Sequence, residues 1–178
     1  MAAVYIRKAV INDLSSVKQI IDEARKKLRA EGSPQWQDGH PDERQLEQDL
    51  RQGVGYVLMA DREAAGYVAV TNSPDPTYQN IYHGKWHNDV DPYVVIHRMA
   101  ISKKFQGQHL STILLSNVIS LCAQRKINNV RFDTYRLNHA LQHLGEKFSF
   151  HYCGEIKVVD QIDPWRLAYE LNLKDNVN

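Results

Sequence analysis

The sequence has almost no excess charge and no long apolar run. Its 22 Lys and Arg side chains oppose 21 Asp and Glu side chains, which leaves a formal net charge of +1. This balance gives no broad positive field for nucleic acid or for an anionic membrane. No uninterrupted apolar segment is long enough to span a bilayer, and residues 1–7 lack the apolar core of a signal peptide. We therefore expect a cytoplasmic protein that binds neither nucleic acid nor membrane.

Cysteine is scarce, and internal repeats and low-complexity tracts are absent. Cys122 and Cys153 each lie in an apolar setting, and two thiols form neither a disulfide framework nor a zinc-binding pattern. A chain of 178 residues is long enough to bury one sizeable core. We expect a single domain over residues 1–178.

The segment from Tyr93 to Arg125 organises the rest of the chain. It begins with an apolar, β-branched run, breaks at residues 102–104 and restarts with helical periodicity, which predicts a buried strand that leads into a helix. Gly107 in the turn permits a positive φ, and the first amides of the following helix lack intrahelical partners. These amides suit an anion such as a pyrophosphate. The same residues would also fit a strand-to-helix turn without any ligand.

The other periodic segments predict strands and helices along the whole chain. We expect further strands at residues 4–9, 55–60, 64–71, 130–135, 148–154 and 165–171. We expect helices that begin at Asn12 or Asp13, at Asp42, after Gly107 and at Asn138. The strand at residues 130–135 should be parallel to the central strand, and residues 72–91, polar but rich in aromatics, should form a long ordered excursion.

The turn at residues 105–111 resembles motif A of the GNAT superfamily of acetyl-CoA-dependent N-acyltransferases, whose pattern is Gln/Arg-x-x-Gly-x-Gly/Ala. Gln106 matches the first position, whereas His109 and Ser111 replace the small residues of the pattern. The order of the elements is also that of the family, and the segments QWQDG, HRMA and RLAYE resemble uncharacterised bacterial members. The resemblance implies an α/β (α+β) fold with a central, twisted, mixed β-sheet flanked by helices.

The same resemblance implies acetyl-CoA or CoA as the co-substrate. The thioester would lie at the splayed end of the central strand, where the backbone N–H of Met99 would stabilise the oxyanion. The implied cofactor-binding residues are Met99, Ala100, Ile101, Gln106, Gly107, Gln108, His109, Leu110, Ser111 and Asn138. The family also implies that the loop around Trp36 borders the acceptor site, although this tryptophan would equally serve to plug the loop onto the core.

His97, Asp133 and Met99 are the candidate catalytic residues. Strand alternation predicts His97 on the same face as Met99, and an imidazole can accept a proton near neutral pH. A core histidine with both nitrogens satisfied is the alternative. Asp133 follows the neighbouring strand, where it would orient His97, attract a cationic acceptor or act only as a turn carboxylate.

The tyrosine that often serves as the general acid in the family is replaced here. Its position falls on Gly145, which leaves Tyr135, His143, a water molecule or direct release of the thiolate. His139 and His143 are four residues apart, but no third metal ligand is evident, so we predict no metal.

These features predict an N-acyltransferase that moves acetyl from acetyl-CoA to the amine of a small-molecule or peptide acceptor by direct attack on the thioester. A homodimer is possible from the sequence. A catalytically degenerate acyl-CoA-binding module is the alternative, prompted by His109, Ser111 and Gly145. A metal-dependent hydrolase would rest only on the histidine pair.

Overall fold

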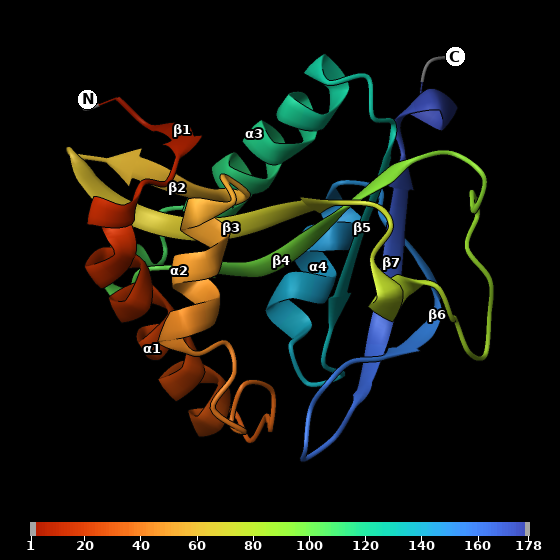
Figure 1. Ribbon diagram of the computed structural model, residues 1–178, viewed down its shortest axis with the longest axis horizontal. Helices are drawn as coiled ribbons and strands as arrows, with labels where there is room; N and C mark the ends of the chain where they lie inside the picture. Colours follow the sequence, from red (N-terminus) through yellow and green to blue (C-terminus); the bar gives the residue numbers. More distant parts are fainter. Residues whose placement is uncertain (1–2, 177–178) are drawn as a thin grey trace.

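The computed structural model describes residues 3–176, so residues 1–2 and 177–178 of the predicted domain lie outside the described range. Its seven strands form one sheet in the order β1-β2-β3-β4-β5-β7-β6 (Figure 1). The strands are β1 (Tyr5–Lys8), β2 (Gly55–Ala60), β3 (Glu63–Asn72), β4 (Tyr93–Ile101), β5 (Asn129–Thr134), β6 (His151–Lys157) and β7 (Trp165–Asn172). The α-helices are α1 (Leu14–Ala30), α2 (Glu43–Arg51), α3 (Leu110–Gln124) and α4 (His139–Lys147). The predicted mixed α/β fold is confirmed.

A split between β4 and β5 is the feature that positions the site. These two strands are parallel, as predicted, but their pairing runs only from Tyr93↔Asn129 to Ile96↔Phe132. Beyond Ile96, β4 continues against β3, whereas β5 continues against β7 to Thr134. The main-chain groups on the facing edges of the diverging strands therefore have no partner strand.

Three buried clusters cover the two faces of the sheet. The largest cluster lies under α3, with side chains of α4 packed against it. On the opposite face, α1 and α2 cover the β1–β4 half, and residues 73–92 cover the β5–β7 half (Figure 1). Tyr78 and Trp86 of that segment are buried, so the ordered excursion predicted there is confirmed. Cys122 and Cys153 lie in different clusters as free, buried thiols.

Local hydrogen bonding explains where the element boundaries differ from the predictions. β6 begins at His151 rather than at residue 148, because the amides of Phe148 and Phe150 bond the carbonyl of Gly145 and close the end of α4. Asp42 caps α2, accepting from the amide of Gln45 at 2.8 Å. No helix among residues 3–176 combines the length and apolar character needed to cross a membrane.

The expected N-cap at the start of α1 differs in detail. Asp13 occupies the cap position, but its carboxylate makes no cap bond to the first turn of α1. It accepts instead from Arg7, at 2.7 and 2.8 Å, and from the amide of Val10 at 2.8 Å. The charged partner on β1 therefore holds the carboxylate away from the helix amides.

Candidate active site

A β-bulge in β4 lies next to the split. Between the pairs Tyr67↔Ala100 and Ala69↔His97, β4 contains one residue more than β3. Arg98 lies within this bulge and adopts a left-handed φ of 55°. A bulge of this kind interrupts the alternation of side chains along a strand.

The bulge overturns one prediction from the sequence. Met99 packs against the core cluster under α3, whereas the ring of His97 meets Tyr78 edge-on, with centroids 6.0 Å apart, in the segment that covers the opposite face. The expectation that His97 and Met99 share a face is therefore wrong, because the period of two does not hold across the extra residue.

The side chain of Arg98 is held by α2. Its Nε and Nη2 atoms donate to the two carboxylate oxygens of Asp49 at 2.8 and 2.9 Å, and the Asp49 side chain is 2 % exposed. The hydroxyl of Tyr67 also donates to Asp49, at 2.9 Å. Burial, followed by the charge of Asp49, raises the pKa of Tyr67 far above its usual value, so the phenol remains a donor. This buried network fixes the bulge from one side.

His97 bonds a carboxylate that the sequence analysis did not identify. Its Nε2 atom lies 3.1 Å from Oδ2 of Asp75, and the two side chains are largely buried. Burial alone would raise the pKa of Asp75, but the hydrogen bond and charge of His97 and the amide of Thr77 outweigh it and lower that pKa. Asp75 is therefore an ionised partner of the imidazole. Its local signal is the Asp-Pro pair at the start of a 3-10 turn, but no pattern links it to His97.

Asp133 has a different partner from the one predicted. Its Oδ1 atom accepts from the hydroxyl of Tyr78 at 2.5 Å, and it is Asp75 that bonds His97, so the orienting role proposed for Asp133 is wrong. Tyr78 is fully buried, and burial followed by the charge of Asp133 raises its pKa well above the usual range. The phenol therefore stays protonated. The second oxygen of Asp133 has no hydrogen-bond partner within the described part of the chain.

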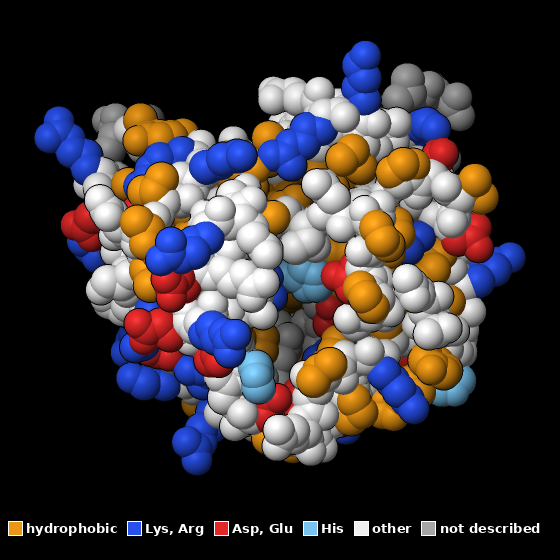
Figure 2. Space-filling view, in the orientation of Figure 1, with side chains coloured by type: hydrophobic (Ala, Val, Ile, Leu, Met, Phe, Trp, Pro, Cys, Tyr) orange, Lys and Arg blue, Asp and Glu red, His pale blue; other side chains and the backbone are white. Residues whose placement is uncertain are grey.

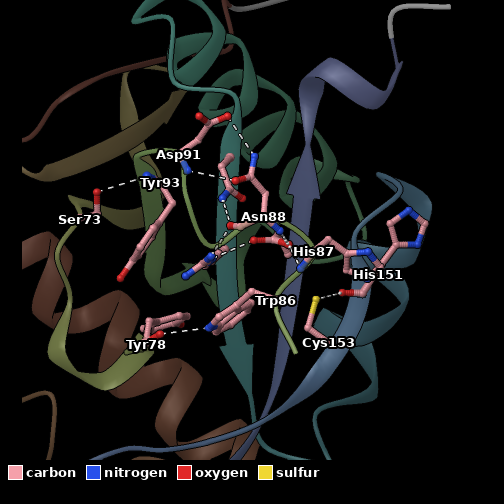
Figure 3. Close-up of polar contacts among 12 residues, drawn as sticks. Ser73, Tyr78, Trp86, His87, Asn88, Asp91, Tyr93, His151 and Cys153 are labelled. Carbon is pink, nitrogen blue, oxygen red and sulfur yellow. Dashed lines mark hydrogen bonds and ion pairs between the residues drawn. The ribbon is translucent and has the colours of Figure 1, made fainter. Parts of the chain in front are cut away.

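A buried ion pair fastens the segment that carries Asp75 and Tyr78. Glu170 of β7 accepts from Arg131 Nε at 3.0 Å and from the amides of His87 and Asn88 at 2.7 and 3.1 Å. The Arg131 guanidinium lies 4.0 Å from the centroid of the Trp86 ring. Figure 3 shows Trp86, His87 and Asn88 of this segment in front of the sheet. Glu170 and Arg131 are both buried and paired with each other. Through the amides of His87 and Asn88, this ion pair attaches the segment to β5 and β7.

A cavity of about 880 Å³ connects the split with both faces of the sheet. Figure 2 shows this side of the molecule hollowed between the α1–α2 half and the β6–β7 half, with histidine and acidic side chains around the opening. All the predicted site residues except Gln108 line it: His97, Met99, Ala100, Ile101, Gln106, Gly107, His109, Leu110, Ser111, Asp133 and Asn138. Trp36 lines it as well, from the loop after α1.

The turn before α3 has the backbone predicted for it. Gly107 has φ +79°, and a Cβ atom there would meet no protein atom within 4 Å. His109, the N-cap residue, also has a positive φ of 57° and makes no side-chain cap bond. The helical bonds begin with the amides of Thr112 and Ile113, which donate to the carbonyl of His109. The preceding amides of the helix are thus at its positive end, next to open space.

Asn138 caps α4 and keeps side-chain hydrogen-bond donors that the described residues do not use. Its Oδ1 atom accepts from the amide of Leu141 at 3.3 Å and so caps α4. Its amide nitrogen makes no hydrogen bond to any described residue, although Asn138 lines the cavity. The N-cap prediction is confirmed, and two donor hydrogens are left over.

The alternatives to the missing tyrosine do not reach the cavity. At Gly145, a Cβ atom would lie 2.6 Å from Cζ of Phe132, so the ring occupies the space of any side chain. Tyr135 donates to Asp163 at 3.0 Å, His143 lies near Glu146 on the surface, and neither lines the cavity. Within residues 3–176, no three His, Cys, Asp or Glu side chains are grouped to hold a metal ion.

The sheet order, the split and the turn before α3 define an acyltransferase-like α/β protein, and comparison with known families agrees. Residues 19–150 match the acetyltransferase (GNAT) family, so the chain belongs to this family of acetyltransferases. The chain is 34 % identical to a GNAT-family acetyltransferase from Streptococcus agalactiae 2603, with a TM-score of 0.86 and 95 % of each chain covered.

More distant structures share the fold. A GNAT-family acetyltransferase from Listeria monocytogenes 4b F2365 is 19 % identical, with a TM-score of 0.74 and coverage of 97 % of this chain and 98 % of that one. A chain of the NatC complex bound to Gag peptide and CoA is 14 % identical, with a TM-score of 0.67 and coverage of 96 % and 98 %. No curated protein sequence matches this chain.

Proposed function

We propose that this acetyltransferase moves the acetyl group of acetyl-CoA to a primary amine by direct attack on the thioester. The observation that carries the proposal is the continuity of one cavity, which runs from the turn at Gln106–Ser111, past Met99, to His97 and Asp133. Both reactants of an acyl transfer can therefore approach the split from separate ends. A positioned thioester and a nearby proton acceptor are what the reaction needs.

The α3 end of the cavity suits the phosphates and the pantetheine arm. The open space at Gly107 and the first amides of α3 would hold the pyrophosphate. The arm would pass along the unpaired edge of β4, where it can bond main-chain groups of Ala100 and Ile101, and it would accept a hydrogen bond from the free amide of Asn138. The CoA-bound NatC chain shares this fold and supports the use of CoA here.

The opposite end carries the acid–base chemistry. The acceptor nitrogen forms the new C–N bond while the C–S bond breaks, and its proton passes to His97 directly or through water. Asp75 is the positioning residue that orients the imidazole and stabilises its protonated form. The N–H of Met99 would stabilise the oxyanion. With Phe132 in the space next to Gly145, the thiolate would leave directly and take its proton from water.

Thiol release tests the proposal. The protein is incubated with acetyl-CoA and a panel of primary amines, free CoA is measured, and the acetylated amine is identified by mass spectrometry. We expect release that depends on the amine and that falls in Gly107→Val at subsaturating acetyl-CoA, because the variant should bind CoA more weakly. The matched control is Gly53→Val, because Gly53 also has a positive φ, of 68°, but lies outside the cavity. Tight CoA binding without turnover of any amine would refute transfer and favour the acyl-CoA-binding module.

A further inference from the structure

Side-chain oxygens that receive no hydrogen bond line the cavity on the side proposed for the amine. Gln35, in the loop between α1 and α2, is only 7 % exposed, and its Oε1 atom is buried and finds no hydrogen-bond partner in residues 3–176. The hydroxyl of Thr71 is likewise buried and unpartnered among the described residues, and the second oxygen of the half-buried Asp133 accepts no hydrogen bond from them. Because a buried acceptor without a donor costs on the order of 1–3 kcal/mol, the oxygens of Gln35 and Thr71 mark a place for a ligand that supplies donors.

The charges around the same space favour a cation. Three basic side chains line the cavity, and each has an acidic partner: Arg98 pairs with the buried Asp49, Arg166 with the buried Asp160, and Lys27 with Glu31 at 3.9 Å. The side chain of Asp38, three positions after Gln35, is 4 % exposed, and within residues 3–176 its partners both belong to His40: the backbone amide donates to Oδ1 at 3.1 Å, and Nδ1 of the exposed ring lies 3.4 Å from Oδ2. A carboxylate retains acceptor capacity under these conditions.

The loop that carries Gln35 and Asp38 is held in place by α1. Arg25 donates from Nε to the carbonyl of Trp36 at 3.1 Å and from Nη2 to the carbonyl of Pro41 at 2.7 Å. Nε2 of Gln37 donates to the carbonyl of Gln35 in the same loop and to the carbonyl of Arg25 in α1, both at 3.1 Å. The acceptor atoms are therefore preorganised, and the Trp36 indole in the same wall adds an aromatic surface suited to a cation.

We propose that Gln35 and Asp38 form a second subsite, which binds a distal ammonium group of the acceptor while the reacting amine lies at His97 and Asp133. An ammonium group has three donors and no acceptor, which matches the unpartnered oxygens. Apolar side chains such as Leu28 and Val158 also line the cavity, which suits an aliphatic chain between two nitrogens. The substrate class is a linear aliphatic diamine; this assignment rests on the proposed function.

The test compares α,ω-diaminoalkanes of increasing length with monoamines of the same length. Binding to the CoA-loaded protein is measured by calorimetry and turnover by thiol release. We expect at least one diamine to bind and react about tenfold better than its monoamine. Gln35→Leu should remove this advantage, and Gln35→Glu should keep or increase it, while CoA affinity stays unchanged in both. The matched control is Gln48→Leu, on the exposed face of α2 and outside the cavity.

The outcomes separate the subsite from the acetyl transfer. Turnover of monoamines and diamines with equal efficiency, or an equal loss for both in Gln35→Leu, overturns the subsite and leaves the proposed transfer standing. Selective calorimetric binding of diamines, lost in Gln35→Leu, supports the subsite even where thiol release fails and the proposed transfer is refuted.

Discussion

The contact between Asp75 and His97 makes the sharpest prediction about the chemistry. Replacing Asp75 with Asn preserves the shape of the side chain and its ability to cap the 3-10 turn at Thr77, but it removes the charge 3.1 Å from the imidazole. Because the lowered pKa keeps Asp75 ionised throughout the neutral range, the wild-type protein presents a full negative charge to His97 at every assay pH above that pKa.

The magnitude follows from the strength of that contact. A hydrogen bond to a charged group contributes about 1.5–3 kcal/mol, and both side chains are largely buried, so screening by solvent is limited. If this energy stabilises the imidazolium formed in the transition state, Asp75→Asn should lower kcat/KM by about 10- to 150-fold. His97→Ala should cost about 100-fold or more.

A double-mutant cycle provides the decisive assay. If Asp75 acts only through His97, the double variant should be no slower than His97→Ala alone. Losses that add would show that Asp75 has a separate structural role. A His97→Ala variant that retains full activity and the same acid limb of the pH profile would refute the base itself, and Asp133 would then be the next proton acceptor to test.

Three other variants test the turn before α3 and the packing of α4. Gly107→Val should weaken CoA binding by more than about tenfold, or 1.4 kcal/mol, measured by calorimetry, because φ of +79° strains any β-branched residue. His109→Gly should tighten CoA binding and relieve about 1 kcal/mol of left-handed strain, raising Tm, whereas unchanged affinity would show that the imidazole points away from the ligand. Gly145→Ala should destabilise the fold by about 1–3 kcal/mol in chemical unfolding, because the new Cβ would lie 2.6 Å from the buried ring of Phe132; a neutral result would show that this contact relaxes freely.

Local pattern predicted most of the fold because the signals that define it are local. β2 has the predicted bounds, β4 and α3 fall in the segment around Gly107, and Asp42 caps α2 as its residue type suggests. The turn before α3 was also predictable, because glycine is one of the few residue types that adopt a positive φ, such as that of Gly107, without strain. These features depend on residues close together in the chain.

The acid–base partners were not predictable in the same way. Asp75 reaches His97 across 22 positions and Tyr78 reaches Asp133 across 55, and no periodicity encodes either distance. Both partners belong to the aromatic segment between β3 and β4, which the sequence marks as ordered without specifying where it packs. Its position depends on the ion pair of Arg131 and Glu170 on β5 and β7. Contacts between residues far apart in the sequence, including the Arg131–Glu170 ion pair, therefore form the part of the site that local patterns did not predict.

The bulge in β4 explains why two polar networks lie next to each other on one face of the sheet. On a regular strand, Arg98 would face the apolar cluster beneath α3, together with Val94 and Ile96, as an unpaired buried charge. The extra residue turns Arg98 to the opposite face, where Asp49 accepts hydrogen bonds from its Nε and Nη2 atoms. Met99 then packs on the apolar side. His97 and Arg98 consequently contact carboxylates on the same face. The residue that breaks the strand pattern thus separates an apolar side beneath α3 from a side on which two carboxylates, Asp49 and Asp75, contact β4.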